Sequence, residues 1–180
     1  MSRQPVTNQQ IVIIGFMGTG KTTVARELGR KLNRLAVDLD ELITRRERRG
    51  PGEIIEQNGE HEFRKIETRL LREVLREELT HIIAVGGGAW TIAANRQLIA
   101  KRGAFTVWLD APFELCWKRI EAGRELRPLA RSREMAEQLY LERRPVYGLA
   151  DAVITVSDGE SAAEIANKVS NAILALQQKA

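Results

Sequence analysis

The 180-residue chain has one cysteine, two histidines and few aromatic residues. A single thiol cannot form an internal disulfide, so Cys116 excludes a disulfide-stabilised scaffold and is typical of a reducing compartment. His61 and His81 have no cysteine or histidine at ligand spacing, which argues against a zinc site. Residues 1–10 lack the apolar stretch of a signal peptide, and no run approaches the ~18 apolar residues of a membrane span. We therefore expect a cytoplasmic protein without a membrane partner.

Acidic and basic residues are nearly balanced. The chain carries 28 lysines and arginines against 24 acidic residues, a net charge of +4. The two signs are interleaved within 41–49 and 69–78, which is typical of solvated helix faces and not of a nucleic-acid-binding patch. We therefore expect no nucleic-acid partner and assign the basic excess to small anionic ligands. The length predicts one domain, and we expect a monomer.

Short apolar runs alternate with segments of helical composition along the chain. The predicted strands are 11–14, 35–38, 82–85, 105–109 and 152–156. The segments between them are long enough for crossover helices. The pattern therefore predicts an α/β fold with a parallel sheet covered on both faces.

Three segments show clear helical patterns. The clearest spans 60–79, where apolar side chains recur at helical spacing. A second helix follows Pro112 and is expected to bury Cys116 and Trp117. A capping box opens a third helix, at 161–177. By contrast, the segment 122–133 is charged and interrupted by glycine and proline, and it is predicted to be a mobile loop.

The residues from Gly15 to Thr22 form the pattern G-x-x-x-x-G-K-T directly after the first predicted strand. Its glycines let backbone N–H groups close around phosphate oxygens, and the next helix directs its positive N-terminus at the same anion. Lys21 can reach the outer phosphates and the Thr22 hydroxyl can bind Mg²⁺. The predicted nucleotide-binding residues are Gly15, Gly18, Thr19, Gly20, Lys21, Thr22 and Thr23.

Two carboxylates, Asp38 and Asp40, end the second predicted strand. Residues two apart in an extended backbone face the same way, so both should meet one point beyond the sheet, where open α/β folds bind ligands. The third strand ends in glycines 86–88, which either form a turn or let a ligand approach the backbone. Because those glycines offer no carboxylate, Asp38 is the candidate metal ligand, through water, and Asp40 the candidate partner of an acceptor hydroxyl. Alternatively, one aspartate caps the helix near Glu41.

Three arginines are candidates for binding anionic groups. Arg64 borders the buried face of its helix, and it either binds a ligand or pairs with Glu60 or Glu67. Arg127 lies in the predicted loop, where a cation could approach a transferring phosphate. Arg143 lies near a helix end, a position that by itself tolerates cations.

In their order along the chain, these motifs resemble those of shikimate kinases over essentially the full length. The family's glycine loop, D-x-D pair, G-E-x-x-F-R-x-x-E stretch, glycine triplet, R-P-L lid and E-R-x-P-x-Y stretch match residues 15–22, 38–40, 59–67, 86–88, 127–129 and 142–147. The resemblance implies a three-layer α/β/α P-loop kinase fold with a five-stranded parallel sheet, similar to nucleoside monophosphate kinases. It also implies ATP-dependent phosphorylation of the 3-hydroxyl of shikimate, with Mg²⁺, as a step of chorismate and aromatic amino acid biosynthesis.

The resemblance implies specific roles for the candidate residues. The catalytic residues are Asp40, Lys21 and Arg127. The substrate-binding residues are Asp40, Phe63, Arg64, Gly86, Gly87, Gly88 and Arg143, and the metal-binding residues are Thr22 and Asp38. Arg119 and Arg127 join the nucleotide site, although Arg119 departs by one residue from the family's spacing for an adenine-stacking arginine. The resemblance further implies a lid at about 122–133 and a helical substrate-binding segment at about 40–67.

The chain departs from the family at a few positions. Ile55 replaces an aromatic residue that often borders the substrate pocket, and Ala130 replaces a leucine after the lid motif.

The nearest alternative function is that of a kinase of another small hydroxy acid, such as gluconate, or of a nucleoside monophosphate. A guanine-nucleotide switch is disfavoured because the Asn167–Lys168 pair lacks the following aspartate. A nucleic-acid binder is disfavoured on charge distribution.

Overall fold

The computed structural model describes residues 9–77, 81–123 and 128–177. Its centre is a five-stranded sheet in the order β2-β3-β1-β4-β5, in which every neighbouring pair is parallel. The strands are β1 (Ile11–Ile14), β2 (Ala36–Asp38), β3 (Ile82–Ala84), β4 (Phe105–Asp110) and β5 (Ala152–Thr155). The predicted five-stranded parallel sheet is therefore confirmed. The first strand has the predicted bounds, and the others differ by one residue at one end.

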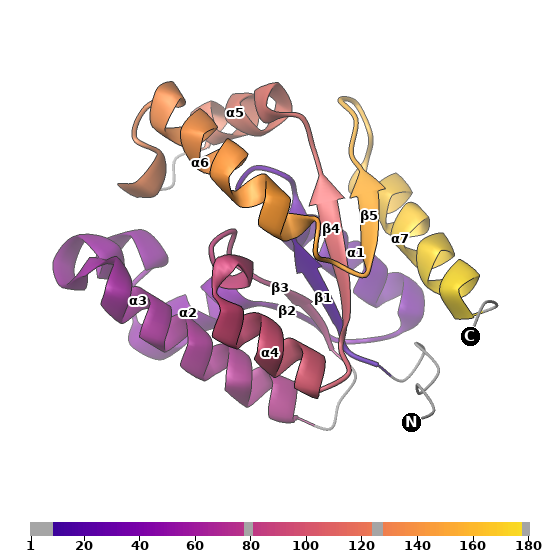
Figure 1. Cartoon of the computed structure of the whole chain (residues 1–180). Coiled ribbons are helices and arrows are strands. Elements are labelled where there is room, and N and C mark those ends of the chain that lie inside the picture. Colours follow the sequence, from indigo (N-terminus) through magenta and orange to yellow (C-terminus); the bar gives the residue numbers. More distant parts are fainter. Residues whose placement is uncertain (1–8, 78–80, 124–127, 178–180) are drawn as a thin grey trace.

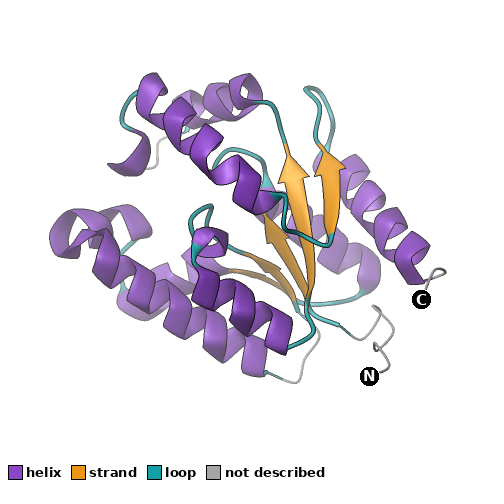
Figure 2. Cartoon of the chain, in the orientation of Figure 1, coloured by secondary structure: helices purple, strands orange, loops and turns teal. Residues whose placement is uncertain are grey.

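Helices cover both faces of this sheet (Figures 1 and 2). The α-helices are α1 (Lys21–Leu32), α2 (Leu39–Glu47), α3 (Pro51–Arg76), α4 (Ala93–Lys101), α5 (Phe113–Ala122), α6 (Arg133–Tyr147) and α7 (Ala162–Gln177). Two 3₁₀ turns, η2 (Ala89–Thr91) and η3 (Pro128–Ala130), precede α4 and α6. Helices α1 and α7 pack on one face, while α4 and α6 lie on the other. The arrangement is the predicted three-layer α/β/α fold.

The most buried strands lie in the middle of the sheet. Every residue of β1 and of β3 is at most 2% exposed, because helices cover both faces. The edge strand β5 alternates, with Val153 half exposed and Ile154 buried. Leu35 lies just outside β2 and is 60% exposed, so the predicted second strand began one residue too early.

Helix α3 begins earlier than the sequence pattern indicated. It starts at Pro51, and it contains a kink at Gly59, whose φ of 84° and ψ of 160° lie outside the helical region. Glycine tolerates this positive φ without the steric cost that a side chain would add. Beyond the kink the predicted apolar stripe is buried from Phe63 to Leu75, except that Ile66 is only partly buried, and the helix ends at Arg76. Leu79, the last residue predicted for the stripe, lies outside the described residues.

The remaining sequence predictions have mixed outcomes. Cys116 is fully buried, as expected, whereas Trp117 is only half-buried and stacks on Phe113. The capping box at the start of α7 is formed, since Ser161 and Glu164 exchange hydrogen bonds. The predicted loop 122–133 contains η3, begins inside α5 and ends at the first residue of α6, and its residues 124–127 lie outside the described part.

No helix within residues 9–77, 81–123 and 128–177 has both the length and the hydrophobicity that crossing a bilayer requires.

Candidate active site

A cavity of about 1320 Å³ opens at the carboxyl ends of the central strands. It lies between the helices α2 and α3 on one side and the η3–α6 segment on the other (Figure 1). Parallel α/β sheets place ligands at this edge. The predicted site residues that line it are Gly18, Gly20, Lys21, Thr22, Thr23, Asp38, Asp40, Phe63, Arg64, Gly86, Gly87, Gly88 and Arg143.

The glycine loop after β1 needs glycine for two separate reasons. Gly15 and Gly18 have positive φ, 145° and 81°. A Cβ on Gly15 would lie 2.7 Å from the Leu109 carbonyl oxygen, and one on Gly18 would lie 2.6 Å from that of Cys116. Gly20 then caps α1 without any side-chain hydrogen bond. The first amides of α1 are therefore available to an anion at the positive end of the helix.

Three polar side chains surround this loop. Thr19 is buried and donates to the Phe16 carbonyl at 2.9 Å, so its hydroxyl holds the loop in shape. Lys21 lines the cavity and its Nζ donates to the same carbonyl at 2.8 Å. Arg119 donates to the Gly18 carbonyl at 3.1 Å, so the structure places it against the loop despite its shifted spacing. Lys21 therefore reaches the cavity, whereas Thr19 and Arg119 hold the loop without lining the cavity.

Asp38 takes the capping role that was left open for one of the two aspartates. Its Oδ1 accepts from the backbone N–H groups of Asp40 and Glu41, at 2.9 and 3.1 Å. Its Oδ2 accepts from the Thr22 hydroxyl at 2.5 Å. The hydroxyl and carboxylate oxygens thus lie side by side at the loop, and such hard oxygens suit Mg²⁺, which usually takes its other ligands from phosphates and water.

Asp40 reaches the cavity in a different way from that predicted. The backbone is not extended here, because β2 ends at Asp38 and Asp40 lies in the first turn of α2. Nevertheless its carboxylate lines the cavity, and its buried Oδ1 atom has no hydrogen-bond partner among the described residues. Desolvation raises the pKa of Asp40 to about 7, and the negative charges of Asp38 and Glu67 act in the same direction. A carboxylate in this state can accept a proton near neutral pH.

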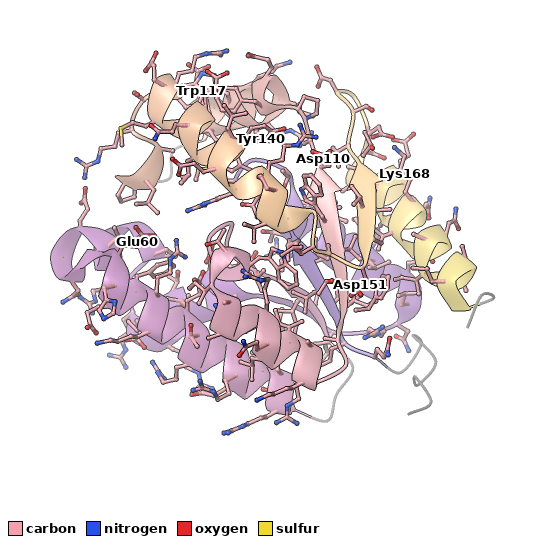
Figure 3. The ribbon with its side chains drawn as sticks, in the orientation of Figure 1. Glu60, Asp110, Trp117, Tyr140, Asp151 and Lys168 are labelled. Carbon is pink, nitrogen blue, oxygen red and sulfur yellow. The ribbon has the colours of Figure 1, made fainter. Side chains whose placement is uncertain are left out.

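Arg64 combines both roles that the sequence left open. It pairs with Glu60 and Glu67 on its own helix, at 2.9 and 2.7 Å, and it also lines the cavity over the Phe63 ring. Figure 3 shows where Glu60 lies on α3. The ion pairs therefore fix the guanidinium without removing it from the site.

Glu67 is a site residue that the sequence reasoning did not select. It lines the cavity and is completely buried, and its Oε1 atom has no hydrogen-bond partner among the described residues. Burial raises its pKa, opposed mainly by Arg64. The available signal was its place on the apolar stripe, four residues after Phe63 and three before Leu70. A carboxylate at such a position usually has a partner or a function.

Each of the three glycines after β3 lies against a different side chain. A Cβ on Gly86 would be 2.7 Å from Glu67 Oε1 and 3.2 Å from Asp40 Oδ1. A Cβ on Gly87 would be 3.3 Å from Arg143 Nη1, and one on Gly88 would be 2.1 Å from Arg64 Nη2. Close approach of side-chain ends therefore distinguishes these positions, and it is closest at Gly86 and Gly88; none of the three has positive φ.

The opposite wall of the cavity comes from η3 and α6. Arg143 is 8% exposed and projects from α6 toward the glycine triplet. Pro128 and Leu129 line the cavity, and Arg131 pairs with Glu56 of α3 at 3.3 Å. Arg127, the predicted catalytic arginine, lies outside the described residues.

The fold and the site together define a class. A phosphate-binding loop faces two arginines and an aspartate with a buried carboxylate oxygen at the carboxyl edge of a five-stranded parallel sheet. This is the arrangement of a P-loop kinase that phosphorylates a small molecule. The family model for shikimate kinase matches residues 17–174. The chain belongs to the shikimate kinase family.

Individual relatives support this membership. The chain is 35% identical to a shikimate kinase of Oceanobacillus iheyensis over 82% of its own length and 80% of the relative. It is 36% identical to that of Ruegeria pomeroyi, over 87% and 80%. The structure of the Acinetobacter baumannii shikimate kinase in complex with shikimate matches with a TM-score of 0.86 at 33% identity, over 93% of both chains. A gluconokinase of Sinorhizobium meliloti, at 18% identity and a TM-score of 0.67, shares the fold.

Proposed function

We propose that this site transfers the γ-phosphoryl group of ATP to the 3-hydroxyl of shikimate, giving shikimate 3-phosphate and ADP. The observation that carries the proposal is the buried Oδ1 atom of Asp40 in the cavity. It has no hydrogen-bond partner within the described part of the chain, and the carboxylate interacts with the Lys21 and Arg64 charges. Membership of the family and the relative solved with shikimate support the choice of substrate.

The nucleotide site is the glycine loop and the start of α1. The uncapped amides after Gly20 and the ammonium of Lys21 bind the β- and γ-phosphates. The Thr22 hydroxyl and the Asp38 carboxylate hold Mg²⁺, which neutralises phosphate charge when bound. Arg119, which contacts the loop, borders the nucleotide.

The acceptor site is centred on Asp40. Its carboxylate accepts a hydrogen bond from the 3-hydroxyl and takes its proton as the new oxygen–phosphorus bond forms. The bond from the γ-phosphorus to the bridging oxygen breaks, and ADP leaves with that electron pair. Charge that builds on the phosphoryl oxygens is offset by Lys21 and by Arg127.

The substrate carboxylate is held by two guanidinium groups. Arg64 and Arg143 reach the cavity from opposite walls, and the glycine triplet lies between the two guanidinium groups. Planar guanidinium groups bind carboxylates through two parallel hydrogen bonds, which fixes orientation as well as affinity. Phe63 packs beneath Arg64 and borders the ring.

A coupled assay of ADP release tests the proposal. Purified chain with ATP and Mg²⁺ should release ADP in the presence of shikimate at a rate far above that with gluconate. Omission of Mg²⁺ should abolish the activity. Equal turnover of gluconate, or no turnover of shikimate, would contradict the proposed substrate.

The acid limb of the pH profile should reflect Asp40. Because its pKa is raised to about 7, the carboxylate of the free enzyme is largely protonated at pH 6 and largely ionised at pH 8. We expect kcat/KM for shikimate to rise with pH through about 7, since this parameter reports groups of the free enzyme. A profile that is flat from pH 6 to pH 8 would show that Asp40 is not the base.

Replacing Arg64 by Lys should raise KM for shikimate. The lysine ammonium cannot form the bidentate contact with the substrate carboxylate. Loss of one charge-assisted hydrogen bond of roughly 1.5–3 kcal/mol corresponds to a KM increase of about 10- to 100-fold. Arg69→Lys is the matched control, because Arg69 lies on the same helix and pairs with Glu47 on the surface. Initial rates against shikimate concentration decide between an unchanged and a raised KM.

We further propose that the chain acts as a cytoplasmic monomer without a nucleic-acid partner. The interleaving of acidic and basic residues supports the last point. Light scattering with and without duplex DNA tests both the mass and the absence of binding. The division into one domain with a lid at 122–133 and a substrate segment at 40–67 is likewise a proposal.

A further inference from the structure

Tyr147 lies at the end of α6, where two parts of the proposed substrate site meet. It is 1% exposed, and its hydroxyl donates to the carbonyl of Gly87 at 2.6 Å. The Arg143 side chain, one helical turn earlier, lies near the same oxygen and lowers the pKa of the phenol. A single buried hydroxyl therefore lies between the glycine triplet and one of the two arginines.

The geometry around Gly87 shows how closely these groups converge. A Cβ built on Gly87 would lie 3.3 Å from Tyr147 Oη and also 3.3 Å from Arg143 Nη1. The following residues are attached to the same helix end, because the Trp90 indole N–H donates to the carbonyl of Val146 at 2.8 Å. The glycine segment is thus fixed to the last turn of α6 at two points.

The hydroxyl is held in its donor form. Burial raises the pKa of Tyr147 to about 12, although Arg143 and Arg64 act in the opposite direction. At neutral pH the phenol is therefore protonated, so it donates to the Gly87 carbonyl and keeps a lone pair that can accept from the neighbouring Arg143. A phenylalanine ring would occupy the same space and make neither bond.

We propose that Tyr147 is a positioning residue for substrate recognition, whose hydroxyl holds the Arg143 guanidinium in register with the Gly87 backbone. The inference rests on the proposed function, because it assumes that Arg143 receives the substrate carboxylate. Without the hydroxyl, Arg143 gains rotamer freedom that must be lost again when substrate binds. This loss of side-chain entropy weakens substrate binding, while the nucleotide site around Lys21 is unaffected.

The chain offers a matched control on the same helix. Tyr140 lies two turns before Tyr147, and its buried hydroxyl likewise donates to a backbone carbonyl, that of Ala111, at 3.0 Å. Figure 3 shows Tyr140 on α6 near Asp110 at the end of β4. Its ring packs against Phe16 and Phe113. Tyr140→Phe therefore removes a comparable hydrogen bond from α6 without touching Arg143 or the glycine triplet.

The test compares Tyr147→Phe with Tyr140→Phe by steady-state kinetics and thermal unfolding. Tyr147→Phe should raise KM for shikimate by about 2- to 10-fold, the effect of immobilising one more side chain on binding, with KM for ATP unchanged and kcat within ~3-fold. It should also reduce the preference for shikimate over its uncharged carboxamide analogue. Tyr140→Phe should lower the melting temperature similarly and change neither KM. Equal effects of the two variants on KM for shikimate, or an unchanged KM in Tyr147→Phe, would overturn the inference.

Two additions keep the outcome interpretable. Turnover of shikimate by the unmodified chain, measured in the same assay, tests the proposed function separately from the role of Tyr147. If Tyr147→Phe does not fold, Trp90→Phe removes the second attachment of the glycine segment to α6. That variant should also raise KM for shikimate, and an unchanged value would count against the inference.

Discussion

Replacement of Asp40 by Asn is expected to abolish turnover while leaving the affinity for ADP unchanged. The amide has nearly the same shape, but it cannot take the proton of the acceptor hydroxyl. General-base groups contribute ~10²–10⁴ in rate, so kcat should fall by about that factor. Nucleotide binding should survive because Lys21 and Thr22 keep their hydrogen bonds to the Phe16 carbonyl and the Asp38 carboxylate. ADP titration calorimetry and the coupled assay provide the two measurements.

The same substitution should change stability in a pH-dependent way. The pKa of Asp40 is raised from 3.8 to about 7 in the folded chain, so the folded state binds this proton more tightly than the unfolded state. The contribution of Asp40 to the free energy of unfolding is therefore fully present below pH 3.8 and is lost as the pH rises through about 7. Because Asn does not titrate, Asp40→Asn should have a higher melting temperature than wild type at pH 8. The difference should be smaller at pH 5.

A control separates the two effects from general damage. Glu41→Gln changes the adjacent carboxylate in the same turn of α2, where Glu41 pairs with Arg26 at the surface. It should alter neither kcat nor the pH dependence of stability appreciably. Loss of ADP binding in Asp40→Asn would instead assign this aspartate to the metal, and unaltered turnover would remove it from catalysis.

Replacement of Arg127 by Ala is expected to have the largest effect on kcat. An arginine that contacts the transferring phosphoryl group contributes ~10³–10⁵ in rate, because it stabilises charge that builds only in the transition state. The sequence places Arg127 directly before Pro128 and Leu129, and these two residues line the cavity. Interactions made only in the transition state lower kcat and kcat/KM together. The single-turnover rate of phosphoryl transfer, measured by rapid quench, is the most direct measurement of this effect.

Arg131 provides the comparison for this substitution. It lies four residues later and pairs with Glu56 at the surface, where each side chain is well exposed. Exposed ion pairs contribute ~0–1 kcal/mol, so Arg131→Ala should leave single-turnover rates almost unchanged. A change in KM for shikimate alone in Arg127→Ala would show that the residue binds substrate instead of the phosphoryl group.

Much of the fold could be predicted because its signals are local. The apolar run at β1 followed by the glycine loop specifies a strand, a turn and a helix in consecutive residues. The spacing between apolar runs then fixes parallel connections. Apolar periodicity did not locate the start of α3, because Gly59 interrupts the helical pattern and only the part beyond the kink has a clear apolar stripe. The helical segment at about 40–67 came from the family resemblance.

The site was harder to predict where residues distant in sequence meet. The sequence indicated Asp40 as a ligand residue, but the reasoning assumed a strand where Asp38 begins a helix. The buried carboxylate of Glu67 and the hydroxyl of Tyr147 acquire their importance only by facing Gly86 and Gly87, which are remote in sequence. Helical spacing reports which side of a helix is buried, and it does not report what lies opposite.

The account is tested most directly by a crystal structure of the chain with ADP and shikimate. It predicts the 3-hydroxyl within hydrogen-bond distance of the Asp40 carboxylate, on the side facing the nucleotide's terminal phosphate. It also predicts the shikimate carboxylate between Arg64 and Arg143. Shikimate bound elsewhere, or bound here with its 3-hydroxyl directed away from Asp40, would contradict the account.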